Sequence, residues 1–198
     1  MMRATTVAPG FDAPVADAQT CFRAILDAMA HPGRVVRGAP AGFATGALAP
    51  ALAAACLTLL DPDAPVWLGD GPRRAEIAEW IAFHTGAGIV AAPQDAAFAI
   101  ITDPTAAPPL RAFRWGTDVS PETGATLLIE TLRLTPGGRW TLRGPGIAAA
   151  TRLEVEGLAA GFIEERRGMV GAFPRGVDIV LTAGVELAAL PRTTMIEG

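Results

Sequence analysis

The residue types that most often perform covalent or acid–base chemistry are scarce in this chain. There is no lysine, and the serine, histidines and cysteines number five in all: Ser120, His31, His84, Cys21 and Cys56. The lack of lysine excludes Schiff-base chemistry, a lysine-anchored pyridoxal phosphate and the lysine of a nucleotide P-loop. Ser120 stands in Ser-Pro-Glu, which is typical of a helix or turn cap and not of an activated nucleophile. The sequence therefore predicts no catalytic residues.

A metal site needs several Cys, His or carboxylate ligands at short spacing. The two histidines lie far apart in the sequence, and no Cys-x-x-Cys is present. An iron–sulfur cluster usually needs three or four thiolates, and this chain has two cysteines. Each cysteine falls on the apolar side of a predicted helix, which favours buried free thiols in a reducing compartment. We therefore predict neither a metal site nor a cofactor.

Two arginine-containing segments are candidates for contacting an anion. Arg143 begins Arg-Gly-Pro-Gly, which either presents backbone N–H groups and a guanidinium to an anion or forms an ordinary turn after a strand. Arg192 and Thr193 follow the last predicted strand. They either bind a phosphate or phosphonate, because arginine offers a planar fork of donors, or fix the tail to the domain through an ion pair.

His84 ends a predicted helix on the same face as Ile77 and Trp80. A histidine there can bond the last carbonyl groups of the helix, which is the structural interpretation. The functional interpretation is a proton donor or an anion contact at a groove between subunits. The candidate ligand or partner contacts are thus spread along the chain: His84, Arg143, Asp178, Arg192 and Thr193.

Composition limits the partners and the location. The chain has 198 residues and a net charge of −4, and 18% of its residues are charged, below the roughly 25% of most domains. The low charge suggests apolar surface covered by a partner, and the lack of a basic stripe argues against nucleic acid. Residues 47–60 are too few to cross a membrane, and residues 1–10 lack a signal-like apolar segment. We expect a cytoplasmic protein with one domain over residues 1–198, in which residues 1–13 are an N-terminal extension.

Helical and strand patterns alternate along the first half of the chain. Helices are expected over 17–30, 47–60, 72–85 and 156–168, and strands over 34–37, 66–68, 97–101, 125–134, 139–143, 177–182 and 186–190. Residues 135–138 have hairpin-turn chemistry. In the first helix Asp17 is the expected N-cap, and the expected apolar face consists of Ala18, Phe22, Ile25, Leu26 and Met29. The pattern predicts an α/β fold with three α/β/α layers and a mixed sheet.

Seven segments in order resemble the PhnH family, the H subunit of bacterial carbon–phosphorus lyase. They run from near residue 14 to the C-terminus: residues 22–33, 58–68, 83–85, 124–128, 142–147, 173–178 and 190–194. Each segment is short, but seven in the family's order over almost the whole chain form a specific signal. Arg175 departs from the family pattern, in which we expect a leucine-like residue between Pro174 and Gly176.

The resemblance implies an accessory subunit without catalytic residues in phosphonate catabolism. In that system, subunits G, H, I and J form a core complex. Subunit I, aided by G, H and an ATP-binding-cassette-type protein L, attaches a phosphonate to ribose from ATP. The resemblance also implies a homodimer when the chain is isolated, and a fold that is a reduced form of the pyridoxal-phosphate transferases. The alternative hypothesis is a stand-alone enzyme or binder of phosphate or phosphonate, which uses Arg143, Arg192 and His84 with Asp178 around a pocket.

Overall fold

The structure is a computed structural model that describes residues 7–197. The α-helices of this part are α1 (Pro14–Ala30), α2 (Pro50–Leu59), α3 (Arg74–Thr85) and α4 (Phe162–Val170). The strands are β1 (Val36–Arg37), β2 (Val66–Leu68), β3 (Phe98–Ile101), β4 (Thr126–Glu130), β5 (Arg133–Arg143), β6 (Thr151–Glu156), β7 (Asp178–Ala183), β8 (Glu186–Leu190) and β9 (Met195–Glu197). Short 3-10 turns occupy residues 93–95, 104–106, 110–112 and 121–123.

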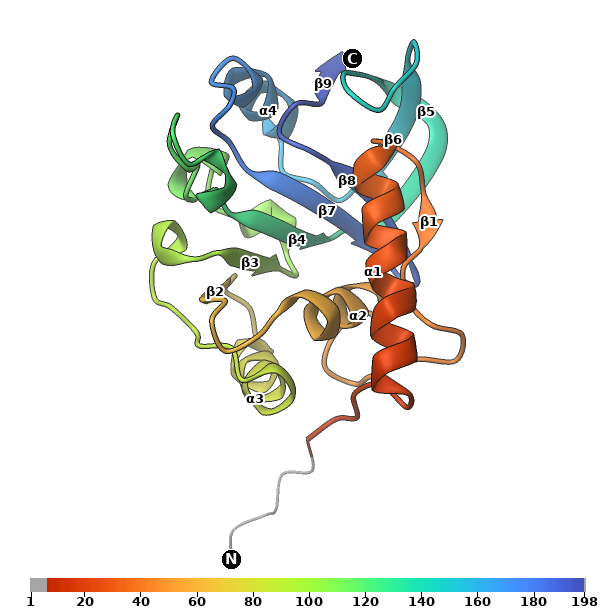
Figure 1. Cartoon of the computed structure of the whole chain (residues 1–198), viewed down its shortest axis with the longest axis vertical. Helices are drawn as coiled ribbons and strands as arrows, with labels where there is room; N and C mark the ends of the chain where they lie inside the picture. Colours follow the sequence, from red (N-terminus) through yellow and green to blue (C-terminus); the bar gives the residue numbers. More distant parts are fainter. Residues whose placement is uncertain (1–6, 198) are drawn as a thin grey trace, which may run out of the picture.

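The main sheet is mixed and has the strand order β1-β8-β7-β4-β3-β2. Strands β2, β3, β4 and β7 are parallel, whereas β8 is antiparallel to β7 and β1 is antiparallel to β8. Figure 1 shows β3, β4 and β7 side by side in the middle of the molecule. The chain between β4 and β7 forms α4 and most of a second, antiparallel sheet of order β6-β5-β9.

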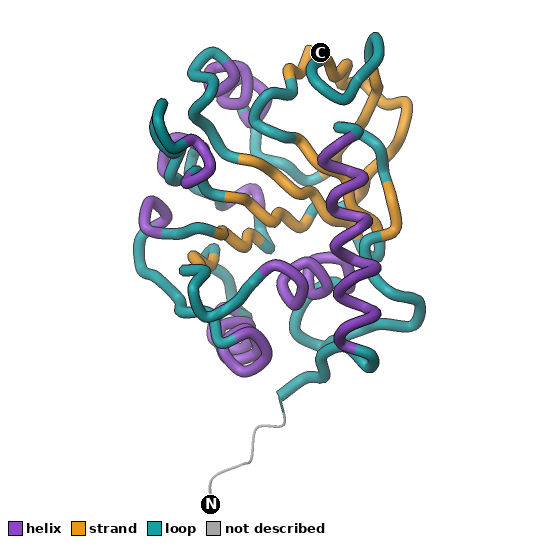
Figure 2. Tube along the Cα trace, viewed as in Figure 1, coloured by secondary structure: helices purple, strands orange, loops and turns teal. Residues whose placement is uncertain are grey.

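Two apolar cores lie on opposite faces of the main sheet. Successive residues of a strand point to opposite faces, so Leu128 packs with α1, α2 and α3 while Leu127 and Ile129 pack with α4 and the second sheet. This arrangement confirms the predicted α/β fold with a mixed sheet. One outer layer is helical, whereas the other combines α4 with the three-stranded sheet (Figure 2). The relation to pyridoxal-phosphate transferases stays a prediction.

Helix α1 differs from the prediction at its start and on its face. It begins at Pro14, a proline in the first turn, so Asp17 lies inside the helix, where its carboxylate accepts a bond from the Ala13 N–H at 3.0 Å. The domain buries Cys21, Ile25 and Ala28, whereas Phe22 and Leu26 of the expected face remain exposed. The sequence therefore carries an apolar face wider than the part that the domain covers.

The predicted hairpin turn at residues 135–138 was wrong. These residues lie within β5, where the register against β6 shifts between Pro136 and Trp140. β4 ends at Glu130, and the chain passes into the second sheet at Arg133, so the predicted strand 125–134 divides between two sheets. The predicted helix over 156–168 is likewise wrong at its start, because β6 ends at Glu156 and α4 begins at Phe162.

Other local predictions are confirmed. Strands β7 and β8 lie where the last two strands were expected, and they pair antiparallel through a turn at Gly184 and Val185. Helix α3 ends at Thr85, and Gly86 after it has a positive φ of 72°, which suits glycine at a helix end. Both cysteines are free and buried. Within residues 7–197, no helix is long and apolar enough to cross a membrane.

Candidate functional site

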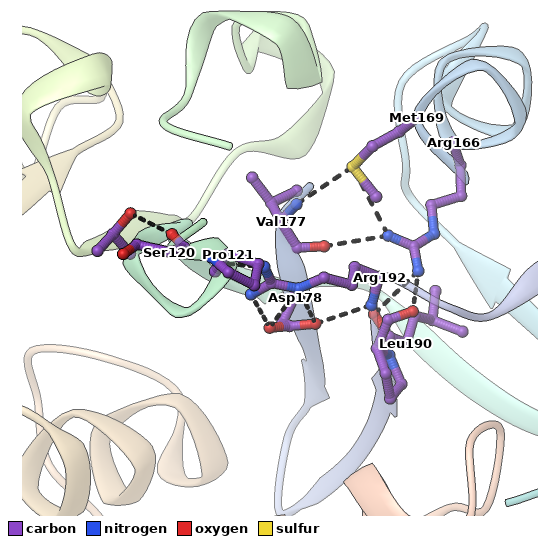
Figure 3. A network of polar contacts seen from close by, with 10 residues as sticks. Ser120, Pro121, Arg166, Met169, Val177, Asp178, Leu190 and Arg192 are labelled. Carbon is purple, nitrogen blue, oxygen red and sulfur yellow. Dashed lines mark hydrogen bonds and ion pairs between the residues drawn. The ribbon is translucent and has the colours of Figure 1, made fainter. Parts of the chain in front are cut away.

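Two of the predicted site residues meet at the amino ends of the parallel strands. Asp178 begins β7 and Arg192 follows β8, and these antiparallel neighbours bring the two side chains together (Figure 3). The Asp178 carboxylate accepts bonds from the Arg192 backbone N–H at 2.7 Å and from Nη2 at 2.5 Å. Their side chains are 19% and 14% exposed, so solvent screens this ion pair weakly.

The remaining donors of Arg192 bond to a loop at the same edge and again to Asp178. Its Nη1 donates to the Pro121 carbonyl, and Nε donates to the Asp178 carboxylate at 3.2 Å. Of the two alternatives for this segment, the structure shows the ion pair that fixes the tail. Ser120 occupies the N-cap position of the adjacent 3-10 turn, but its backbone carbonyl and not its side chain makes the bond, accepting from the Thr123 hydroxyl at 2.8 Å.

Arg166 of α4 is a buried residue of this cluster that sequence reasoning missed. It is 0% exposed and donates to the carbonyl groups of Val177 at 3.1 Å and Leu190 at 3.3 Å, and also to that of Pro191. Burial lowers the pKa of Arg166 to about 10, with Asp178 opposing and Arg192 adding to that shift. Arg166 thus joins α4 to β7 and to the segment after β8.

A signal for Arg166 was present in the sequence. It lies between Phe162 and Met169 at helical spacing, and all three side chains are buried on one face of α4. An arginine at an apolar position of a helix indicates a guanidinium held by backbone carbonyls, because a buried charge must be hydrogen-bonded. Arg166 belongs to a Glu-Glu-Arg-Arg run, whose charges mask this apolar spacing.

Arg143 and Thr193 lie near each other, next to the same cluster. Arg143 ends β5, and its side chain contacts Glu197 at 3.3 Å and donates to the Ala149 carbonyl at 3.0 Å. A Cβ atom on Gly144 would lie 2.9 Å from the Thr193 carbonyl oxygen, so the two segments pack backbone to backbone. The structure thus brings Arg143, Thr193, Arg192 and Asp178 to one end of the molecule. A ligand role for any of them stays a prediction.

His84 lies apart from these four residues. It is near the end of α3, and its Nε2 is 2.9 Å from the carbonyl oxygen of Ala8. Trp80 donates to the same carbonyl at 3.1 Å, and the His84 ring also packs against the Trp80 and Phe83 rings. His84 therefore joins α3 to the N-terminal segment. In the structural interpretation it was expected to bond the carbonyl groups of its own last turn instead.

The carboxyl ends of the parallel strands carry a hollow that the sequence analysis did not identify. It has a volume of about 290 Å³ and is lined by Glu130, Arg73, Thr102, Asp103 and residues 47–49, just before α2. Burial raises the pKa of Glu130, against the opposing effects of Arg73 and the Ala49 backbone. Ligands of open α/β sheets often bind at this edge. A glutamate at the end of an otherwise apolar strand was the available signal. Among residues 7–197, no group of three or more His, Cys, Asp or Glu has metal-binding geometry.

Comparison with known proteins decides the family. The model of the family described as bacterial phosphonate metabolism protein (PhnH) matches residues 9–197. The chain belongs to the PhnH family. It is 37% identical over 187 residues, 94% of each chain, to a Rhizobium meliloti (strain 1021) protein named alpha-D-ribose 1-methylphosphonate 5-triphosphate synthase subunit PhnH. It is also 35% identical to the putative C-P lyase subunit protein HtxG of Stutzerimonas stutzeri, over 182 residues that are 90% of this chain and 85% of that one.

The PhnH match confirms the resemblance drawn from the ordered segments. At the departing position, Arg175, the structure supplies a local partner. Arg175 Nε lies 3.2 Å from an Asp118 carboxylate oxygen, and both side chains are substantially exposed. The arginine therefore links two loops at the amino ends of β4 and β7 without entering the apolar core.

Proposed function

We propose that this chain is an accessory, non-catalytic subunit of the carbon–phosphorus lyase core complex. There it supports the transfer of a phosphonate to ATP-derived ribose, which makes ribose 1-phosphonate 5-triphosphate in phosphonate catabolism. It acts in the cytoplasm as one domain, with subunits G, I and J as partners and protein L as an indirect one. Family membership and the names of both relatives, each named as a subunit of such a system, support this function.

The structural observation that carries the proposal is an apolar stripe on the outer side of α1. It consists of Val15, Phe22 and Leu26, which are 87%, 45% and 50% exposed, with Met29 and Ala18 half-buried at its side. The stripe is adjacent to the face that the domain buries, and it contains most of the apolar face predicted from the sequence. Clustered apolar side chains that a domain leaves exposed often mark a protein contact.

The spacing of the stripe indicates a helix as its partner. Val15, Phe22, Leu26 and Met29 follow one another at intervals of seven, four and three residues. Two helices that pack along a common seam use this repeat. Because both relatives are named as subunits, we assign the stripe to a helix of another subunit of the complex.

Co-purification tests the proposal. The full chain is co-expressed with subunits G, I and J, and the bound subunits are quantified for wild type, Phe22→Glu and Leu26→Glu. We expect wild type to retain its partners and each stripe variant to lose them by about tenfold or more, because a glutamate would be desolvated in the contact. Phe83→Glu is the matched control, because Phe83 is 69% exposed on α3, outside the stripe.

Three results would count against this assignment. Turnover of ATP with methylphosphonate by the pure chain would show that it is an enzyme in its own right. Absence of the other subunits from the purified wild type would contradict membership of the complex. The isolated chain is expected to be a homodimer, so its mass is measured as well. If Phe22→Glu dissociates that dimer but leaves the other subunits bound, the stripe belongs to a second copy.

A further inference from the structure

A groove of about 510 Å³ lies between the segment after α1 and the hairpin that joins β5 to β6. Residues 31–35 form one wall, and the bulge of β5 with residues 146–152 forms the other. Each wall includes part of a family segment, residues 31–33 in one and 146–147 in the other, and neither contributes to the α1 stripe. A volume of this size is in the range that small organic molecules occupy.

Glycines allow the two walls to meet. Gly146 has a φ of +82°, and a Cβ atom there would collide with the Ala30 carbonyl oxygen. Gly33 has a φ of +83°, and a Cβ atom there would collide with the side chain of Leu142. Substitution at either position would separate the segments. The groove is thus formed by close backbone packing and not by loosely placed loops.

The lining of the groove is basic in a chain whose net charge is −4. His31, Arg34 and Arg152 line it, and no carboxylate does. Two other hollows differ in this respect. Arg73 shares the carboxyl-end hollow with Asp103 and Glu130, and Arg139 shares the hollow beside α4 with two glutamates. An excess of guanidinium groups in a concave site attracts anions.

The basic side chains differ in how they are held. Asp27 lies behind the groove, 3.0 Å from His31 Nδ1 and 3.0 Å from Arg34 Nη1. Each contact uses one nitrogen and leaves the remaining nitrogens of that side chain for a ligand. Arg152 is exposed, and the described residues 7–197 offer it no hydrogen bond or ion pair. Its guanidinium therefore has all five donors available.

We propose that this groove binds a small organic phosphate or phosphonate. Arg34 and Arg152, from opposite walls, bind the anionic oxygens through charge-assisted hydrogen bonds, and the His31 ring lies beside Arg34 in the same wall. Pro32, Val35 and Ile147 line the same groove and contact the organic substituent. This binding site goes beyond the proposed subunit function and needs no other protein.

Calorimetric titration of the isolated full chain at low ionic strength tests the site. The probes are phenylphosphonate, phenyl phosphate and inorganic phosphate. We expect both phenyl compounds to bind more tightly than inorganic phosphate, because their rings reach the apolar lining. Arg152→Gln is expected to weaken phenylphosphonate binding by about tenfold, the effect of losing charge-assisted bonds. Arg23→Gln on the exposed side of α1 is the matched control.

Arg34→Gln provides a second test, with thermal unfolding measured to show that the variant is folded. Binding that is equal in wild type and in both groove variants would overturn the proposal, as would the absence of heat with every probe at millimolar concentration. Binding of poly-glutamate without binding of the phenyl compounds would also overturn it, in favour of an acidic protein segment. Loss of co-purification with the other subunits would leave this measurement unaffected, so the two proposals fail separately.

Discussion

The two ends of the parallel strands are built in opposite ways. At the amino ends, Asp178 accepts from Arg192, and Arg166 donates to backbone carbonyl groups. The side chains of these three residues are largely buried. At the carboxyl ends, Glu130 and Arg73 line a hollow that remains open. The closed end fixes the position of α4, the tail and the neighbouring loops. At the open end, burial disfavours the ionised form of Glu130 and so raises the pKa of this carboxyl group.

The largest expected effect comes from Arg166→Met, which removes the donors at the closed end. The carbonyl groups of Val177 and Leu190 would be left without this partner inside the protein. An unsatisfied buried acceptor costs about 1–3 kcal/mol, so the free energy of unfolding should fall by about 3–5 kcal/mol. Urea denaturation measures this change. A loss below about 1 kcal/mol would show that the cluster does not hold the closed end together.

A smaller loss is expected for Asp178→Asn. The amide can still accept from the Arg192 N–H, but Arg192 and Arg166 lose the negative charge between them. Because the pair is slightly exposed, we expect a loss of about 2–3 kcal/mol in the free energy of unfolding, less than for a fully buried pair. Arg143→Ala is the control, since the Arg143–Glu197 pair is 48% and 60% exposed and should contribute under about 1 kcal/mol. Equal effects of the two variants would remove the distinction between closed and exposed pairs.

Glu130→Gln at the open end should have the smallest effect and the opposite sign. A raised pKa in the folded state means that the carboxyl group favours folding below its ordinary pKa, and that this contribution is lost as the pH rises through the raised pKa. The neutral amide should therefore raise the melting temperature at neutral pH, and the gain should vanish at acidic pH. Solvent screening of the half-buried group keeps the effect to about 0.5 kcal/mol or less. A variant less stable than wild type at neutral pH would contradict this sign.

Local patterns predicted the elements that local chemistry determines. The sequence predicted helix α3, the places of strands β7 and β8, and the burial of both cysteines, because these follow from spacing and apolar periodicity. The hairpin turn predicted at residues 135–138 was wrong because turn chemistry there competes with pairing to β6, a partner that only the folded chain provides. The buried face of α1 was predicted wrongly for a related reason. Periodicity shows which residues are apolar but not which protein covers them.

The candidate site was predicted only in part. Asp178 and Arg192 were named, and their meeting follows once β7 and β8 are paired. Arg166 was missed because the charged residues next to it in sequence masked its helical spacing with the buried Phe162 and Met169. His84 was expected to bond its own helix, and a carbonyl from the N-terminal segment, distant in sequence, is its partner instead.

The adjacency of β4 and β7 has a consequence for how the chain reaches its native state. These strands are hydrogen-bonded neighbours, yet β5, β6 and α4 separate them in the sequence. The β5–β6 pair is joined by a short hairpin and can form early, whereas the pairing of β4 with β7 must close a long loop. Closing such loops is slow, so β4 should pair with β7 after β5 has paired with β6. During synthesis, the central parallel pair cannot form until most of the chain has left the ribosome.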